Sequence, residues 1–171
     1  AHLVFFWTCG WTTCWLSLPN AAWCLRIINW LALACAWRWF NVGLVSRPMA
    51  AVFSAGLLVV GLWYGPMMGE WVIGGIEGKS IAYVFVVFSL GMLVRERWNW
   101  SWTCLGVATM FHVLVGGWSA VALGVVWLAA GRHRPLIRSI LPGIVVAGIL
   151  SLAGLLPALL LNHGVLNDVM A

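Results

Sequence analysis

Apolar residues run from one short charged link to the next along the whole chain. Hydrophobic side chains make up 64% of the 171 residues and charged ones 8%, with fourteen tryptophans and a mean hydropathy of +1.02. A water-soluble domain of this size could not bury so much apolar surface. The composition therefore predicts an integral membrane protein, and at about 20 residues per crossing the length allows roughly six to eight spans.

Charged, proline-containing and Gly-Gly segments divide the apolar runs into predicted helices. The expected fold is all-α, a polytopic transmembrane helix bundle of about seven helices in one domain over residues 1–171. The helices of the pair within 98–131 are short or re-entrant. Because no initiator Met or signal peptide is evident, we expect a fragment of a longer membrane protein. The predicted ranges are 3–18, 21–39, 48–64, 80–94, 98–115, 117–131 and 137–161.

Basic residues fall on alternate links of this helix plan. If the link at 95–97 is cytoplasmic, seven of the nine basic residues share its side and two face outward, which follows the positive-inside rule. The net charge of +5 then serves orientation and contact with membrane lipids, and a nucleic-acid partner is not expected. The inner set is Arg38, Arg47, Arg95, Arg97, Arg132, Arg134 and Arg138, and the outer set is Arg26 and Lys79.

The same plan gathers polar residues at the outer face. The link from Tyr64 to Lys79, the outer end of helix 98–115, a turn at Gly116-Gly117 and the tail from Asn162 all lie there. Three of the four acidic residues of the chain are in these segments. The gathered residues are Glu70, Glu77, Lys79, His112, Asn162, His163 and Asp168.

The stretch Gly74-Gly75-Ile76-Glu77-Gly78-Lys79-Ser80 ends like a phosphate-binding P-loop. The spacing excludes that motif, because position 73 is Ile where a glycine is required, and an apolar run follows the lysine. Two interpretations stay open. In the first, Glu77 favours the positive end of helix 80–94 and Lys79 extends to the membrane interface. In the second, Gly74, Gly75 and Gly78 turn backbone N–H groups toward a phosphate, Lys79 supplies the countercharge, and Glu77 is a base or a ligand to a divalent metal ion.

His112 and Glu70 are the other candidate site residues. An ionisable group within a span usually faces protein or water, so His112 is a structural hydrogen-bonding group, a substrate- or proton-handling group, or a metal ligand. Glu70 lies in a short apolar segment that runs along the outer surface and could form the floor of a lateral opening for a lipid.

Small residues recur at four-residue intervals on two of the predicted helices. Such stripes let the backbone of a neighbouring helix approach closely, so they predict helix packing. The stripes are Gly116, Ala120 and Gly124 on one helix, and Gly143, Ala147 and Ser151 on the other.

Three motifs within residues 69–130 resemble a group of bacterial polytopic proteins that look like membrane glycosyltransferases of the C superfamily. This resemblance implies an all-helical enzyme of the bacterial inner membrane that takes a sugar from a polyprenyl-phosphate donor at the outer face. In that superfamily a catalytic acid lies in the first outer loop, whereas this chain has no acid before Glu70. Either that loop precedes residue 1, or the chemistry differs, or the resemblance is limited to the fold. The motifs are Glu77-Gly78-Lys79-Ser80-Ile81-Ala82-Tyr83, Arg95-Glu96-Arg97-Trp98 and Phe111-His112-Val113-Leu114-Val115-Gly116-Gly117-Trp118.

The leading hypothesis is thus part of a glycosyltransferase-C-like enzyme that uses a lipid-linked sugar. Glu77 and His112 are the catalytic candidates, the first as a base or metal ligand and the second as a substrate hydrogen-bonding group. The substrate-binding candidates are Lys79, Glu70, Gly74, Gly75 and Gly78. The alternatives are a transporter or lipid-handling protein that uses the same cluster for binding, and a non-catalytic subunit that holds protein partners within the membrane.

Overall fold

The computed structural model describes residues 2–45, 47–64 and 75–170, and every regular element in these ranges is helical. The prediction of an all-α fold is confirmed. The α-helices are α1 (His2–Cys9), α2 (Leu18–Leu44), α3 (Pro48–Tyr64), α4 (Gly78–Val94), α5 (Trp98–Phe111), α6 (Val113–Ala129) and α7 (Ile137–Met170), and the short 3₁₀ helices are η1 (Gly10–Cys14) and η2 (Gly131–His133).

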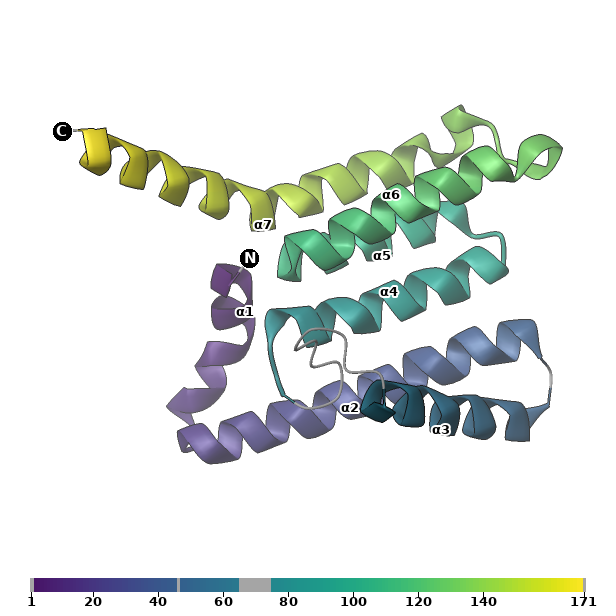
Figure 1. Ribbon diagram of the computed structural model, residues 1–171, viewed down its shortest axis with the longest axis horizontal. Helices are drawn as coiled ribbons and strands as arrows, with labels where there is room; N and C mark the ends of the chain where they lie inside the picture. The colour runs from purple at the N-terminus through teal and green to yellow at the C-terminus, as the bar shows by residue number, and fades with distance from the viewer. Residues whose placement is uncertain (1, 46, 65–74, 171) are drawn as a thin grey trace.

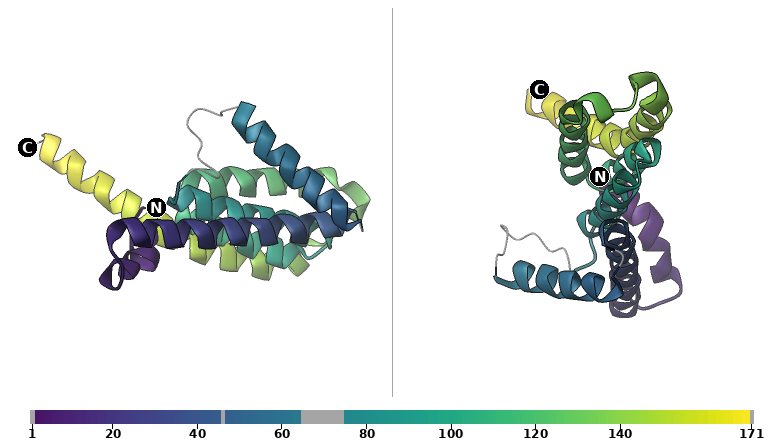
Figure 2. Two further views of the ribbon diagram at one scale, coloured as in Figure 1. Left: turned by 90° about the horizontal axis from the view of Figure 1, so that it is seen from below. Right: turned by 90° about the vertical axis from the view of Figure 1, so that its right-hand side faces the viewer.

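Helix α5 lies at the centre of the bundle (Figure 1). It packs against α4, α6 and α7, and α2 packs against α4, whereas α3 contacts mainly α2 and stands away from the other helices (Figure 2). A buried polar pair joins α4 to α5: the hydroxyls of Ser89 and Ser101 lie 2.7 Å apart, and each lies 3.1 Å from the other residue's carbonyl oxygen. Because both hydroxyls are satisfied, the pair fixes the register of the two helices without leaving a buried polar group exposed to apolar surroundings.

The links between helices collect at two ends because successive helices from α2 to α7 alternate in direction (Figure 1). The arginine end holds Arg47, Arg95, Arg97, Arg132 and Arg134, on the links after α2, α4 and α6. The Glu77 end holds Glu77, Lys79 and His112, at the start of α4 and the α5–α6 junction. The basic clusters and the candidate site residues of the described chain therefore lie at opposite ends of the bundle, as the alternation predicts.

Small residues allow α5 and α7 to approach closely. A Cβ atom on Gly143 would lie 2.6 Å from the Cα atom of Asn99, and Gly106 of α5 faces the backbone of Ala147. The packing predicted for Gly143 and Ala147 is confirmed. On α6 the prediction is half right. Gly116 packs against the backbone of Thr109, but a Cβ atom on Gly124 would have no other residue within 4 Å.

The predicted helix 3–18 is wrong, because α1 ends at Cys9 and η1 follows. Threonine hydroxyls compete with regular helical bonding in this segment: Thr12 Oγ1 donates to the Cys9 carbonyl at 2.6 Å and Thr13 Oγ1 to the Gly10 carbonyl at 2.7 Å. Glycine at position 10 further disfavours a continuous helix. Helix α2 then begins at Leu18, with Pro19 in its first turn, and extends to Leu44 rather than ending at residue 39.

The boundary between the predicted helices 98–115 and 117–131 is also displaced. The chain reverses at His112, and Gly116-Gly117 lies inside α6 instead of forming the turn. Gly116 serves packing: α6 turns back along α5 one helical turn after the reversal, and only a glycine admits the Thr109 backbone there. Sequence reasoning mistook a packing glycine for a turn glycine.

One described stretch, Ile137–Pro157 of α7, is both long and apolar enough to cross a membrane, with 21 residues and a mean hydropathy of 2.2. The other apolar helices Met49–Gly61, Gly78–Val94 and Val113–Ala129 are shorter. Helix α7 contains Pro142 and Pro157 and continues past the predicted end at residue 161, extending beyond the bundle in Figure 1. The side chains of the predicted outer residues Asn162, His163 and Asp168 lie outside the described part.

Candidate functional site

Helix α4 begins with a capping box formed by Glu77 and Ser80. The Glu77 carboxylate accepts from the backbone N–H of Ser80, and Ser80 Oγ accepts from the backbone N–H of Glu77 at 3.0 Å. Lys79 Nζ lies 3.9 Å from Glu77 Oε2, and 57% of the Glu77 side chain is exposed against 17% for Lys79. The carboxylate thus caps the helix, as the first interpretation predicts, and is still open to solvent on one side.

Gly78 sets the start of α4 against the α5–α6 junction. It is buried, and a Cβ atom at this position would lie 2.7 Å from the Phe111 carbonyl oxygen. Any larger residue would therefore push α4 away from the junction. Through this contact the structure brings Glu77 and Lys79 to the residue that precedes His112, so three of the predicted site residues share one region.

His112 alone forms the junction between α5 and α6. Its backbone is extended, with φ −150° and ψ 103°, and its N–H donates to the Ala108 carbonyl at the end of α5. Its Nδ1 atom accepts from the backbone N–H of Val115 at 3.3 Å and so caps the start of α6. This bond requires Nδ1 to be unprotonated, which leaves the proton of a neutral imidazole on Nε2. The structural interpretation of His112 is supported by this geometry.

The register between α2 and α4 decides which α2 residues reach this region. Leu33 and Ala36 pack with Val84 in one core cluster, and a Cβ atom on Gly91 would lie 3.4 Å from the Cα atom of Phe40. The two helices run in the same direction with the same rise per residue (Figure 1). A residue a given number of positions before Phe40 in α2 therefore lies at the same height along the bundle as the residue the same number of positions before Gly91 in α4.

By this register, Asn29 is level with Ser80 and Arg26 is level with Glu77. Asn29 lies on the α2 stripe that faces α4, at helical spacing from the buried Leu33. Arg26 precedes Asn29 by one turn, and its guanidinium lies 4.7 Å from the centre of the Trp23 ring. Two polar residues of α2 thus lie at the same height along the bundle as the first turn of α4.

Both of these residues carry buried donors without a partner in the described chain. Asn29 is 5% exposed and its side-chain nitrogen has no hydrogen-bond partner, and the same holds for the buried Nε atom of Arg26. Leaving a buried donor unpaired costs about 1–3 kcal/mol, so such groups are rare in interiors and call for a functional explanation. Together with Lys79 they place cations and donors at this end, next to the Glu77 carboxylate that caps α4 and lies 3.9 Å from Lys79 Nζ.

Sequence reasoning placed Arg26 on the outer side but did not include Arg26 or Asn29 in the site. A signal was present, because positions 26, 29, 33, 36, 40 and 43 alternate spacings of three and four, as the buried stripe of a packed helix does. An arginine and an asparagine on such a stripe stand out against its apolar members. What the spacing alone could not supply is the partner helix and its level.

The remaining predicted residues are placed only in part. Gly75 lies at the bend before α4, and a Cβ atom there would meet nothing within 4 Å. Glu70 and Gly74 lie outside the described residues. Within the described ranges, no three His, Cys, Asp or Glu side chains form a group suited to a metal ion, and a metal role for Glu77 stays a prediction.

Comparison with known proteins adds no relative. No protein-family model, no curated protein and no solved structure matches the chain. The resemblance to glycosyltransferases of the C superfamily therefore stays a prediction.

Proposed function

We propose that the chain is part of a polytopic membrane protein whose Glu77 end binds the phosphate of a lipid-linked sugar. The membrane part of the proposal rests on the apolar surface. Large apolar side chains are exposed along several helices, for example Phe53 at 70% and Leu57 at 73% on α3, and Trp118 at 72% on α6. Helices α4 and α6 have 17 residues, the lower bound of about 17–25 for a spanning helix.

Orientation supports the choice of ligand side. With the arginine end in the cytosol, the Glu77 end meets the outer water boundary of the bacterial inner membrane. Polyprenyl-phosphate donors present their phosphate at that boundary while the chain stays in the lipid. The exposed apolar faces of the neighbouring helices are suited to such a chain.

The observation that carries the proposal is the pair of buried donors on α2, at the height of the start of α4, that have no partner among the described residues. Arg26 and Lys79 supply positive charge, Asn29 supplies a donor, and the α4 N-terminus adds its dipole. Cations and N–H donors bind phosphate well, and the described residues contain no group of side chains suited to a metal ion. Phosphate is therefore the ligand that matches the site best.

Catalysis in this proposal follows the resemblance: Glu77 takes the proton from an acceptor hydroxyl, the oxygen bonds to the sugar, and the lipid phosphate leaves. His112 donates a hydrogen bond from Nε2 to the substrate.

The experiment is transfer from a radiolabelled polyprenyl-phosphate sugar by the full-length protein in proteoliposomes. Glu77→Ala removes both the carboxylate and the cap, whereas Glu77→Ser removes the carboxylate but leaves a good cap. If Glu77 is the base, both variants lose transfer at least about 100-fold, and only the alanine variant also loses about 0.5–2 kcal/mol of stability. Full transfer in Glu77→Ala and in His112→Ala would remove these residues from the mechanism.

A lipid-handling protein without covalent chemistry is the second candidate, and the caps favour it. Glu77 and His112 each cap a helix, so both have a structural use that needs no reaction. In that case the same site would bind the lipid phosphate and release it unchanged. Movement of a fluorescent polyprenyl phosphate between leaflets, with no new product, would favour this candidate, and Arg26→Gln should slow the movement.

A further inference from the structure

A cavity lies at the arginine end, on the loop between α6 and α7. Its volume is about 720 Å³. Two arginines line it, and the rest of its wall is apolar or glycine. The lining residues are Trp127, Gly131, Arg132, Arg134, Pro135, Leu136 and Ile137.

Local interactions hold this loop in shape. Gly131 adopts φ +54°, a left-handed conformation that glycine tolerates best, and the chain turns there after α6. The indole N–H of Trp127 donates to the Pro135 carbonyl at 3.0 Å, and the Arg134 guanidinium lies 4.8 Å from the centre of the Trp127 ring. The loop is thereby preorganised, with Arg134 placed over an aromatic wall.

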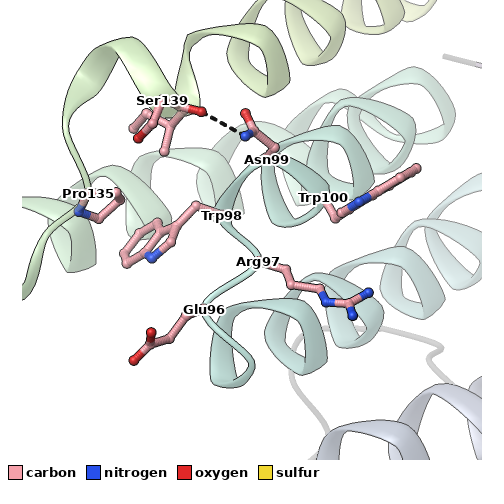
Figure 3. Close-up of a pocket in the computed structure, with 8 residues that line it drawn as sticks. Glu96, Arg97, Trp98, Asn99, Trp100, Pro135 and Ser139 are labelled. Carbon is pink, nitrogen blue, oxygen red and sulfur yellow. Dashed lines mark hydrogen bonds between the residues drawn. The ribbon is translucent and has the colours of Figure 1, made fainter.

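The charge of this cavity differs from that of its neighbour. Arg132 and Arg134 are exposed, and no carboxylate of the described residues lies within 4 Å of either. The adjoining pocket, of about 410 Å³, shares Pro135 but includes Glu96 next to Arg97. Figure 3 shows Glu96 and Arg97 leaving the chain in different directions there, with Asn99 bonded to Ser139. Of these two pockets, the α6–α7 cavity is the one lined by arginines without an acid among the described residues.

We propose that the α6–α7 cavity binds the phosphate of an anionic phospholipid headgroup in the membrane leaflet at the arginine end. Arg132 and Arg134 match the phosphate, because guanidinium groups donate paired hydrogen bonds to its oxygens. The apolar part of the wall argues for a lipid: Leu136 is 79% exposed and Ile137 57%, directly beside the arginines. The glycerol and first acyl carbons cover these side chains while the indole of Trp127 lies at headgroup level. The proposal does not depend on the activity of the Glu77 end.

The test is lipid binding to the purified protein in detergent, measured by native mass spectrometry. Phosphatidylglycerol is titrated against phosphatidylcholine of the same acyl chains. The wild-type protein should retain one phosphatidylglycerol with strong preference. Since each interfacial arginine contributes about fivefold, the double variant R132Q/R134Q should lose the preference by about 25-fold. The matched control R38Q/R47Q removes the same charge outside the cavity, at Arg47 of the arginine end and at Arg38 in the last two turns of α2, and should keep the preference.

The outcomes separate the possible sources of the anion. Unchanged preference in R132Q/R134Q would overturn the proposal, and so would an equal loss in R38Q/R47Q, which would indicate a diffuse charge effect. Inorganic phosphate should displace the lipid far less effectively than short-chain phosphatidylglycerol does. Equal displacement would identify a free-anion site and refute the lipid assignment. Thermal unfolding of each variant in the same detergent identifies any loss that comes from misfolding.

Discussion

Two asparagines, one at each end of the bundle, are used in opposite ways. Asn99 at the arginine end donates from Nδ2 to the Ser139 carbonyl at 2.7 Å and accepts at Oδ1 from the Gly143 N–H at 2.9 Å. These two backbone groups are i and i−4 partners in a regular helix, so the Asn99 amide bridges the turn of α7 that contains Pro142. Asn29 is buried near the Glu77 end, and its side-chain nitrogen has no partner in the described chain.

Two arginines repeat this contrast. The Arg95 guanidinium donates to the carbonyls of Gly91 and Trp39, at 2.7 and 2.8 Å, and lies 4.0 Å from the centre of the Trp39 ring. Arg26 has a buried Nε atom without a partner among the residues that the structure describes. Asn99 and Arg95 at the arginine end hold helices together, whereas the unpartnered donors of Arg26 and Asn29 on α2 cost stability. Trp102 of α5 also has a buried Nε1 atom without a partner among the described residues. Residues that cost stability in place are the better candidates for ligand binding.

The largest expected effect is that the two ends of the bundle face different compartments. In a background without the native cysteines, Glu77→Cys and Glu96→Cys place single thiols at exposed positions of the two ends. If the bundle spans the membrane, an impermeant maleimide added to intact cells labels one thiol fully and the other not at all. Labelling after lysis is the control for reactivity. Equal labelling of both thiols in intact cells would mean that the two ends share a compartment, and the proposed site would then lose its outer location.

Matched substitutions of the two asparagines give the next largest effect. Asn99→Leu leaves the Gly143 N–H and the Ser139 carbonyl without this partner and should lower the free energy of unfolding by about 2 kcal/mol. Asn29→Leu replaces an unpaired buried amide by a side chain of similar size and should leave stability unchanged or raise it by about 1 kcal/mol. Unfolding in mixed micelles measures both changes.

The two asparagine substitutions should also differ in their effect on ligand binding. Binding of polyprenyl phosphate should weaken in Asn29→Leu and stay at the wild-type value in any fraction of Asn99→Leu that remains folded. A large loss of stability in Asn29→Leu would show that its amide has a structural partner, and the argument for a ligand at this position would fail.

The sequence predicted the helical class, the range of α3, and the separation of basic from candidate site residues. These features depend on composition, apolar periodicity and the placement of charge, which are local or additive properties. Helix α3 is a clear case: Pro48 starts it, a continuous apolar run follows, and the chain around it offers no competing signal.

The errors fall where tertiary contacts decide between two uses of one residue. In the sequence, Gly116-Gly117 is equally compatible with a turn and with close packing of two helices. In the structure Gly116 packs against the backbone of Thr109, so the second use is the correct one. His112 reads as mid-helix because its cap bond to Val115 is visible only once the chain reverses. The sequence does not predict Asn29 as a site residue, because its height relative to Ser80 depends on how α2 packs against α4, and a single sequence does not contain that packing.

The smallest expected effect is the difference in stability between lysine substitutions of the two arginines. It tests whether Arg95 stabilises the fold through its hydrogen bonds while Arg26 does not. A lysine at position 95 reaches one carbonyl where the guanidinium reaches two, so Arg95→Lys should lose about 1 kcal/mol of unfolding free energy. Arg26→Lys keeps the charge over Trp23 and removes the unpaired Nε, so its stability should stay within about 0.5 kcal/mol of the wild type. Polyprenyl phosphate binding should respond in the reverse order, because a planar donor fork at position 26 is replaced by a point charge. Equal destabilisation by both substitutions would show that Arg26 is a structural clamp like Arg95, and the Glu77 end would then have to bind its phosphate through Lys79 and the α4 N-terminus alone.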